Sequence, residues 1–241
     1  MPKKIAIVVT NQSEYPGHNR PTGLWLSELV HFWDVLEPEG FEFDLVSPKG
    51  GETPLEPKSL EGVAFDRATK ARYEDKAFME RLKHTLAASD VNWEDYDAVY
   101  YTGGHGVMYD FLDDEGLQAL NRNLYENGRV VSAVCHGYCG LLNTKLSNDE
   151  YLIQGKTMTG FSWLEERLAG VAKKVPYNSE EEAKKRGADY KKALLPFAPH
   201  VRVHDRLITG QNPGSATQTA KRTLEVIRET KRDPAEVEQR V

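Results

Sequence analysis

The sequence predicts an α/β fold, a three-layer α/β/α sandwich built on one mostly parallel sheet. Two observations predict it. Short apolar, β-branched segments alternate along the chain with helical segments, and some of these strands are apolar throughout, as strands covered on both faces are. The 241 residues suit one large domain. We therefore expect a single domain over residues 1–241, with insertions at 48–95 and 160–200 that cap the ligand-binding edge of the sheet.

The predicted strands are rich in β-branched and aromatic residues and end at turn signals. They cover residues 3–10, 41–47, 97–101, 130–134, 200–203 and 207–209. The turn signal Asn-Trp-Glu-Asp at 92–95 precedes the third strand. A further extended segment is expected within residues 151–159.

The predicted helices carry apolar residues at helical spacing, or charged residues that pair along one face. They cover residues 22–36, 67–88, 114–128, 179–190 and 215–231, and another helix opens at 160–166. In the first, Leu26, Leu29, Val30 and Trp33 recur at helical spacing. The polar tail at 232–241 is expected to fray.

Composition and charge restrict the function. Lys and Arg number 31 against 37 Asp and Glu, a net charge of −6, which argues against nonspecific binding of nucleic acid. The apolar run at 5–9 is too short for a signal peptide or a membrane span, so no membrane association is expected. Two cysteines do not make a disulfide scaffold. A reducing compartment, the cytoplasm, is the expected location.

A cysteine at the end of a predicted strand is the most informative feature of the chain. The strand Val130–Val134 stops at Cys135, and a tight turn into a short helix follows. Small residues, Ala133 and Gly137, lie two positions before and after the cysteine, as a nucleophile elbow requires. His136 is adjacent, and the helix N-terminus facing the thiol is expected to lower its pKa. The alternative is a small buried hydrophobic residue, as most free cysteines are.

A glycine-rich turn, Thr-Gly-Gly-His-Gly at 102–106, follows the strand at 97–101. Such glycines let backbone N–H groups approach a ligand closely. A phosphate cradle is one interpretation, but the Lys-Ser/Thr pair of a P-loop is missing. Since a cysteine-bearing strand follows in the same sheet, an oxyanion hole is the better interpretation, with Gly103, Gly104 and His105 as candidates for it and for substrate binding. A plain tight turn is the alternative.

The other candidate residues favour structural roles on sequence alone. Cys139, one turn beyond the first cysteine, is expected to be buried packing, with a resolving thiol as the alternative. Cys-x-x-Cys ligand spacing does not occur, and the histidines are most simply surface or hydrogen-bonded residues, so we expect neither a metal nor a cofactor. His105 is the exception among the histidines, because it lies on the glycine-rich turn. Glu28, on the first predicted helix, is most simply a solvated glutamate.

Several segments together resemble the PfpI superfamily, which has a flavodoxin-like, glutamine amidotransferase-like fold. The resemblance is carried by Ala-Val-Cys-His-Gly at the elbow, by the preceding Gly-Gly-His-Gly and by Leu-Ile-Thr-Gly-Gln-Asn-Pro-Gly-Ser-Ala at 207–216. Residues 22–31 and 156–161 resemble, more narrowly, the heat-shock chaperone/glutathione-independent glyoxalase III branch. The resemblance covers nearly the whole chain, although members are described as glyoxalases, deglycases, chaperones and peptidases.

The resemblance implies roles for individual residues. Cys135 is the nucleophile and His136 is its partner. Glu28 approaches the thiol as a carboxyl whose pKa is raised, so that it can donate a hydrogen bond. An acid just after the Thr-Gly-Phe landmark orients the histidine: Glu166 is the first choice, and Glu165 is its competitor.

The resemblance also implies that the backbone amides of Gly104 and His136 form the oxyanion hole. Two departures from the family pattern bear on the substrate. Tyr138 replaces a common proline, and Trp163 and Leu164 replace small or polar residues. We expect both departures to narrow the pocket.

The function that the resemblance implies is that of a glutathione-independent glyoxalase, a lyase without cofactor. It converts a 2-oxoaldehyde such as methylglyoxal to a 2-hydroxy acid such as D-lactate through a cysteine hemithioacetal, and relatives are often homodimers. The alternatives are a holdase-type stress chaperone that binds unfolded proteins, or a protein deglycase. A cysteine peptidase or amidase ranks lower, because neither His200 nor His204 begins the late His-x-Glu pair of amidotransferase glutaminases.

Overall fold

A computed structural model describes residues 3–230, whose core is a seven-stranded sheet of order β10-β11-β7-β6-β1-β4-β5. All neighbouring strands are parallel except β10 and β11, which pair antiparallel at one edge. The prediction of a mostly parallel sheet is confirmed. The strands are β1 Lys4–Val8, β4 Glu42–Ser47, β5 Leu86–Ala87, β6 Ala98–Tyr101, β7 Val130–Val134, β10 Val201–His204 and β11 Leu207–Gly210.

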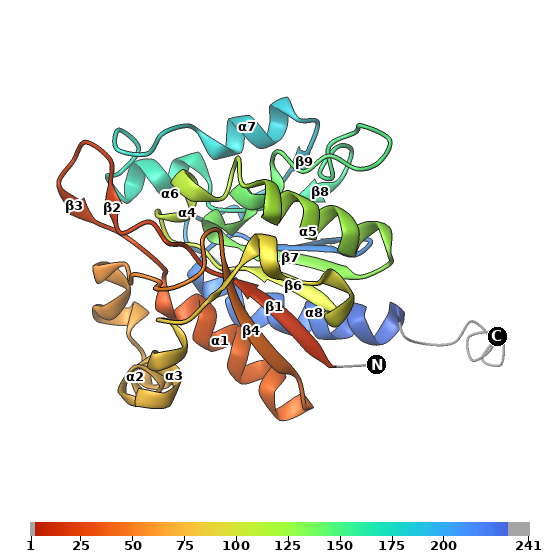
Figure 1. Cartoon of the computed structure of the whole chain (residues 1–241). Coiled ribbons are helices and arrows are strands. Elements are labelled where there is room, and N and C mark those ends of the chain that lie inside the picture. The colour runs from red at the N-terminus through yellow and green to blue at the C-terminus, as the bar shows by residue number, and fades with distance from the viewer. Residues whose placement is uncertain (1–2, 231–241) are drawn as a thin grey trace.

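Helices cover both faces of this sheet (Figure 1). Alternate side chains of β1 enter two different cores, because successive residues of a strand point to opposite faces. Ile5 and Ile7 pack with residues of α1 and α8, whereas Ala6 and Val8 pack with residues of α4 and α5. The predicted three-layer sandwich is therefore confirmed. The helices are α1 Leu26–Leu36, α2 Arg67–Glu74, α3 Lys76–Arg81, α4 Val107–Asp110, α5 Glu115–Glu126, α6 Trp163–Leu168, α7 Ser179–Lys185 and α8 Ala216–Thr230.

The single helix predicted over residues 67–88 is wrong. Asp75 has an extended backbone that ends α2, and its carboxylate accepts hydrogen bonds from the first amides of α3. Leu86 and Ala87 then add β5 to the edge of the sheet. The charged residues favour a helix over the whole segment. Asp75, however, caps a second helix and so ends the first one.

Other element boundaries also differ from prediction. The first helix begins at Leu26 rather than residue 22, because Leu24 forms a strand-like bridge with Leu55. Of the extended segment expected within 151–159, only β8 Thr157–Met158 is a strand, and it pairs with β9 Asp189–Tyr190, where a helix was predicted to continue. Residue 231 and the predicted tail at 232–241 lie outside the described residues.

Small elements connect the main strands and helices, and apart from the short helix that begins at Cys135 the sequence did not reveal them. A two-stranded hairpin of β2 Glu14–Tyr15 and β3 Arg20–Pro21 lies between the strand predicted at 3–10 and the helix predicted from residue 22. The short 3-10 helices cover Glu37–Glu39, Pro57–Leu60, Gly62–Ala64, Ala88–Asp90, Trp93–Asp95, Cys135–Leu141 and Pro213–Ser215.

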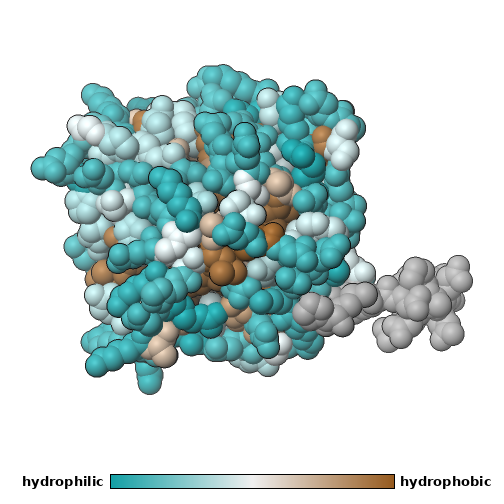
Figure 2. Space-filling view, viewed as in Figure 1, coloured by the Kyte–Doolittle hydropathy of each residue, from teal (hydrophilic) through white to brown (hydrophobic). Residues whose placement is uncertain are grey.

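The surface is mainly polar where Figure 2 shows it, with hydrophobic side chains in small separate patches. This agrees with a sequence in which 28% of residues are charged. Within residues 3–230, no helix is both long and apolar enough to cross a bilayer.

Candidate active site

Cys135 lies at the carboxyl end of β7, where the chain turns sharply into the 3-10 helix Cys135–Leu141. Its φ is +55°, a left-handed conformation that non-glycine residues rarely adopt and that recurs at functional sites. The turn has no room for a larger residue at Gly137, where a Cβ atom would lie 2.4 Å from the carbonyl oxygen of Tyr101. The local geometry is that of an elbow that presents a side chain at the sheet edge.

Glu28 is fully buried on α1, so it is not the solvated glutamate of the simplest interpretation. The amide N–H of Gly103 donates to its Oε2 over 2.5 Å. Burial raises the pKa of Glu28 to about 8, although hydrogen bonds from Gly103 and Cys135 act in the opposite direction. At neutral pH the carboxyl is therefore mainly protonated and able to donate a proton.

The expected lowering of the Cys135 pKa is wrong for the free protein. Burial and the neighbouring Glu28 raise the thiol pKa well above its usual range, and the amide N–H of His136 offsets only part of this. The helix that follows is a short 3-10 helix, and the thiol is only 3% exposed. Desolvation of the thiolate therefore outweighs the partial charge of one helix end.

Two histidines share the Glu166 carboxylate. Nε2 of His136 lies 2.6 Å from Oε2 of Glu166, and Nε2 of His105 lies 2.8 Å from Oε1. On its other side, Nδ1 of His136 lies 3.4 Å from Sγ of Cys135. Burial would raise the pKa of Glu166, but the two imidazoles hold it well below its usual range. Burial also lowers the pKa of His136, even though the carboxylate opposes this, so the ring is neutral at neutral pH.

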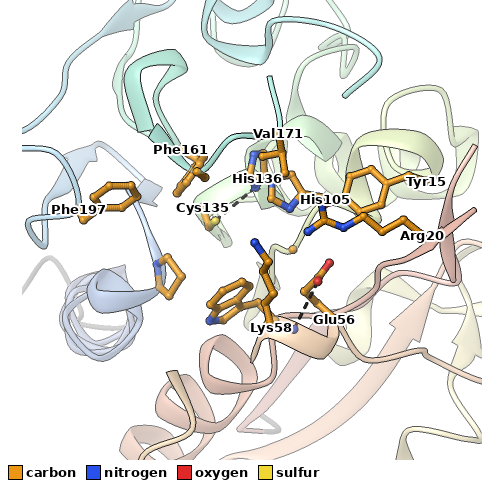
Figure 3. A pocket seen from close by; sticks show the side chains of 14 residues that line it. Tyr15, Arg20, Glu56, Lys58, His105, Cys135, His136, Phe161, Val171 and Phe197 are labelled. Atoms are coloured by element: carbon orange, nitrogen blue, oxygen red, sulfur yellow. Dashed lines mark hydrogen bonds between the residues drawn. The ribbon is translucent and has the colours of Figure 1, made fainter. Parts of the chain in front are cut away.

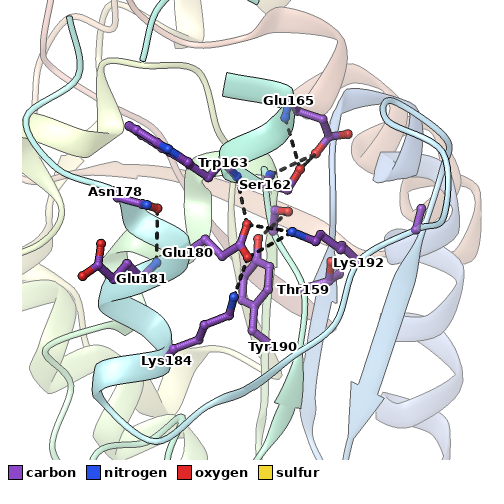
Figure 4. Close-up of polar contacts among 12 residues, drawn as sticks. Thr159, Ser162, Trp163, Glu165, Asn178, Glu180, Glu181, Lys184, Tyr190 and Lys192 are labelled. Carbon is purple, nitrogen blue, oxygen red and sulfur yellow. Dashed lines mark hydrogen bonds and ion pairs between the residues drawn. The ribbon is translucent and has the colours of Figure 1, made fainter. Parts of the chain in front are cut away.

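Glu165, the competitor of Glu166, points to a different set of partners. Its Oε2 accepts hydrogen bonds from the amide and hydroxyl of Ser162, which caps α6 (Figure 4). Its Oε1 accepts from the amide of Phe197 and from Nδ2 of Asn212. The spacing Ser162-x-x-Glu165 is a capping box, a sequence signal that assigns Glu165 to helix capping.

The amide N–H of Gly103, a candidate for the oxyanion hole, donates to Oε2 of Glu28. A Cβ atom at Gly103 would lie 2.8 Å from Oε2 of Glu28 and 2.9 Å from both Cβ of Cys135 and the amide nitrogen of His136. This glycine therefore allows three functional groups to converge. Gly104 lies in the pocket wall, with a φ of +104° that favours glycine.

Cys135, His136 and His105 open into a cavity of about 160 Å³ (Figure 3). The other lining residues come from loops and caps around the sheet edge, and sequence reasoning did not find them. They are Tyr15, Arg20, Trp25, Glu56, Lys58, Phe161, Ala169, Val171, Phe197 and Pro213.

The expected narrowing of the pocket by the two departures from the family pattern is wrong. Tyr138 is buried and does not line the cavity. Its ring occupies the space beside Gly160, where a Cβ atom would lie 2.2 Å from it. Trp163 and Leu164 line a separate surface hollow. Both replacements act away from the thiol.

His105, His136 and Glu166 also form a potential metal-binding group, which the histidine spacing in the sequence could not reveal. Their candidate ligand atoms all lie within 4.8 Å of one another. Two imidazoles and a carboxylate are ligands that transition metals accept. Hydrogen bonds between the same atoms account for this arrangement without an ion.

The comparison with protein families shows which family this chain belongs to. A model described as the DJ-1/PfpI family matches residues 22–226, which include Glu28, Cys135 and Glu166. The chain belongs to the DJ-1/PfpI family. The predicted resemblance to the PfpI superfamily is thereby confirmed.

Two fungal members of the DJ-1/PfpI family are similar over most of this chain. The glutathione-independent glyoxalase HSP31 of Saccharomyces cerevisiae is 32% identical over 239 residues, 94% of this chain and 99% of the relative. Glyoxalase 3 of Candida albicans is 30% identical over 231 residues, 90% of this chain and 95% of the relative.

Solved structures of this family superpose closely. The Rapid Encystment Protein 24 KDa of Francisella tularensis has a TM-score of 0.89 and 33% identity, covering 93% of this chain and 99% of its own. Glyoxalase III of Candida albicans has a TM-score of 0.86 and 29% identity, covering 92% and 96%. The architecture is therefore shared along nearly the whole chain.

Proposed function

We propose that this protein is a glutathione-independent glyoxalase that converts 2-oxoaldehydes such as methylglyoxal to 2-hydroxy acids such as D-lactate. The observation that carries the proposal is the pairing of a buried, mainly protonated carboxyl with a neutral imidazole on either side of one thiol. Aldehyde addition needs a nucleophile and an acid, and isomerisation needs a base. The names of the relatives agree with this chemistry.

The first step joins the sulfur of Cys135 to the aldehyde carbon. Glu28 gives its proton to the aldehyde oxygen and takes up the thiol proton, so a neutral hemithioacetal forms and the carboxyl stays protonated. This relay avoids a free thiolate, which the raised thiol pKa disfavours. The amides of Gly104 and His136 are proposed to stabilise negative charge on the oxygen as the bond forms.

The second step moves hydrogen from the first carbon to the second. Nδ1 of His136 takes the C1 proton while Glu28 protonates the C2 oxygen, which gives an enediol. Return of the proton to C2, with loss of the proton from the C1 oxygen, leaves a thioester of the 2-hydroxy acid. Water then breaks the carbon–sulfur bond and releases the acid and a proton, and the thiol of Cys135 is restored.

Replacement of the thiol tests this proposal. Cys135→Ala is expected to abolish methylglyoxal consumption and lactate formation, whereas Cys139→Ala, at a buried cysteine outside the pocket lining, is the matched control. Melting curves of both variants verify that they fold. Undiminished turnover in a folded Cys135→Ala protein would contradict the proposal.

Exposed apolar side chains support a second candidate function, that of a holdase. Leu194 and Leu195 are 101% and 71% exposed, and Leu168 and Phe197 are 59% and 50% exposed. Contiguous exposed apolar patches mark protein-binding surfaces, and Leu194 and Leu195 are adjacent in the sequence. Suppression of aggregation that survives Cys135→Ala but is lost in Leu194→Ser/Leu195→Ser would support a separate chaperone function.

We further propose that the protein acts in the cytoplasm as a homodimer. Both cysteines are free, which suits a reducing compartment. Fractionation of cells and light scattering of the purified protein test these two points directly.

A further inference from the structure

We propose that Lys58 and Arg20 form a carboxylate-binding subsite in the wall of the catalytic cavity. The inference rests on the proposed glyoxalase function and adds a substrate class to it: 2-oxoaldehydes that carry a carboxylate on their carbon chain. Both residues line the same cavity as Cys135, and both cationic groups point into it (Figure 3).

The backbone that carries Lys58 is fixed close to the site. The segment before it is joined to the start of α1, since Leu24 donates to Pro54 and Glu56 donates to Leu24 over 2.8 and 2.9 Å. Gly23 has no room for a Cβ atom against the carbonyl of Pro54. Lys58 lies on the 3-10 helix Pro57–Leu60 that follows. The ammonium group of Lys58 therefore projects from a backbone that is fixed against the start of α1, the helix that carries Glu28.

Arg20 is positioned by an aromatic partner. Its guanidinium lies over the ring of Tyr15 at 5.2 Å from the ring centre, and both residues belong to the small hairpin of β2 and β3. Tyr15 is itself buried against the ring of His105. A guanidinium held in this way keeps its N–H groups for a planar anion such as a carboxylate.

The charges of these two residues are not neutralised by an ion pair. Within residues 3–230, none of the ion pairs with an N–O distance of 4.0 Å or less involves Lys58 or Arg20. The nearby Glu56 is occupied otherwise: Oε2 accepts from the hydroxyl of Thr22, and Oε1 accepts from the backbone N–H of Lys58. The cavity wall thus holds two cations and one carboxylate, Glu56, whose two oxygens are already hydrogen-bonded, and this excess of positive charge suits an anionic ligand.

The reaction and the cavity both fit a carboxylate. The cavity of about 160 Å³ is more than about ten times what one water needs by the same measure, so a chain longer than that of methylglyoxal has room. Apolar side chains such as Phe161 and Val171 line the rest of it. The same subsite would also hold the carboxylate that the reaction itself creates. Two molecules can therefore bring a carboxylate to this subsite: a substrate with a carboxylate on its carbon chain, and the 2-hydroxy acid product.

The first arm of the experiment compares two substrates of equal chain length, the carboxylate-bearing 4,5-dioxopentanoate and the uncharged 2-oxopentanal. The catalytic efficiency, kcat/KM, is measured for each substrate, and the value for the charged one is divided by the value for the uncharged one. We expect this ratio to exceed one for the wild type and to fall about tenfold in Lys58→Gln and in Arg20→Gln, since hydrogen bonds to charged groups have that strength. Lys58→Arg should restore most of it. Lys70→Gln, at an exposed lysine on α2 outside the pocket, is the matched control.

The second arm identifies the product as the source of the carboxylate. D-Lactate and its uncharged amide are compared as inhibitors of methylglyoxal turnover. If only lactate inhibition weakens in Lys58→Gln and Arg20→Gln, the subsite holds the product carboxylate. If neither the substrate ratio nor lactate inhibition responds to these variants, the subsite does not exist.

Failure of the proposed function gives a different result. If the wild type converts neither oxoaldehyde, the glyoxalase proposal fails, and calorimetric titration with 4-oxopentanoate and with the uncharged 2-pentanone decides the subsite. Binding of 4-oxopentanoate that is lost in Lys58→Gln supports a carboxylate site, and equal or absent binding of the two probes overturns it.

Discussion

Oε2 of Glu166 lies 2.6 Å from Nε2 of His136, while Nδ1 of the same ring lies 3.4 Å from the sulfur of Cys135. A carboxylate that accepts the Nε2 proton leaves Nδ1 unprotonated. The lone pair of the imidazole then faces the thiol and the space where the substrate binds. In the proposed mechanism, Glu166 thereby determines which nitrogen of His136 acts as the base.

We expect Glu166→Gln to lower kcat by about a hundredfold or more, because a glutamine amide can donate to Nε2 and stabilise the wrong tautomer. Glu165→Gln should instead lower the free energy of unfolding by about 1–3 kcal/mol, since the Glu165 carboxylate accepts hydrogen bonds from four donors. Steady-state kinetics and urea unfolding of both variants separate the two effects. Equal losses of kcat would contradict this division of roles.

The sequence alone could not determine which of these two glutamates contacts His136. Adjacent residues on a helix point about 100° apart, so the direction of each depends on where the helix begins. Ser162 determines that start, and its capping box occupies Glu165 and turns Glu166 toward His136. The family resemblance narrowed the third group to two residues, and the local capping geometry separates them.

The Glu28 carboxyl should limit activity at high pH. Its pKa is raised to about 8, so the protonated acid that the reaction needs is lost as the pH rises through that value. We expect kcat to decline above about pH 8, and Glu28→Gln to be slower by about 10²–10⁴-fold without that decline. A pH–rate profile of both proteins from pH 5 to 10 tests this. A wild-type rate that rises through pH 8 would indicate that a thiolate, not a carboxylic acid, limits the rate.

The same carboxyl should destabilise the fold at neutral pH. Its pKa rises from 4.5 to about 8 on folding, so the folded state binds the proton more tightly and stability falls as the pH rises between these values. Glu28→Gln does not titrate, and we expect it to gain up to about 3 kcal/mol relative to the wild type at pH 7. Urea unfolding at pH 5 and pH 8 should show a larger gain at pH 8. An equal gain at both pH values would argue against a raised pKa.

His105 is expected to act through its neighbours. It donates to Glu166, and its charge adds to burial, the main cause, in lowering the pKa of His136. His105→Gln retains a donor without the charge, so the pKa of His136 should rise and the acid limb of the kcat profile should move to higher pH. The loss in kcat should be smaller than that of Glu166→Gln. An unchanged acid limb would indicate that His105 only packs against the site.

Gly103→Ala should damage the site directly. The added Cβ atom has no space between Glu28 and Cys135, so we expect loss of most activity together with a lower melting temperature. Gly155→Ala is the control, because no atom lies within 4 Å of the new Cβ, and its φ of +70° adds a backbone strain that Gly103→Ala does not have. Full activity in Gly103→Ala would show that the convergence at this glycine is dispensable.

The fold was more predictable than the walls of the pocket. Apolar strands such as Val130–Val134 are local patterns, and the elbow at Cys135 follows from its immediate neighbours. Arg20 and Lys58 instead lie on a small hairpin and a 3-10 helix in segments where the sequence shows only turn residues. Their positions depend on distant contacts, such as that between Leu24 and Leu55, which no local pattern reports.

The convergence at Gly103 has a consequence for the protein as a whole. Glu28, Gly103, Cys135 and Glu166 belong to four separate stretches of chain, which come together only when β1, β6 and β7 lie side by side. Catalytic activity therefore requires the whole folded chain, and we expect a fragment of the chain to have no activity. A destabilising substitution elsewhere in the sheet should lower the fraction of folded molecules, while the kcat of each folded molecule stays unchanged.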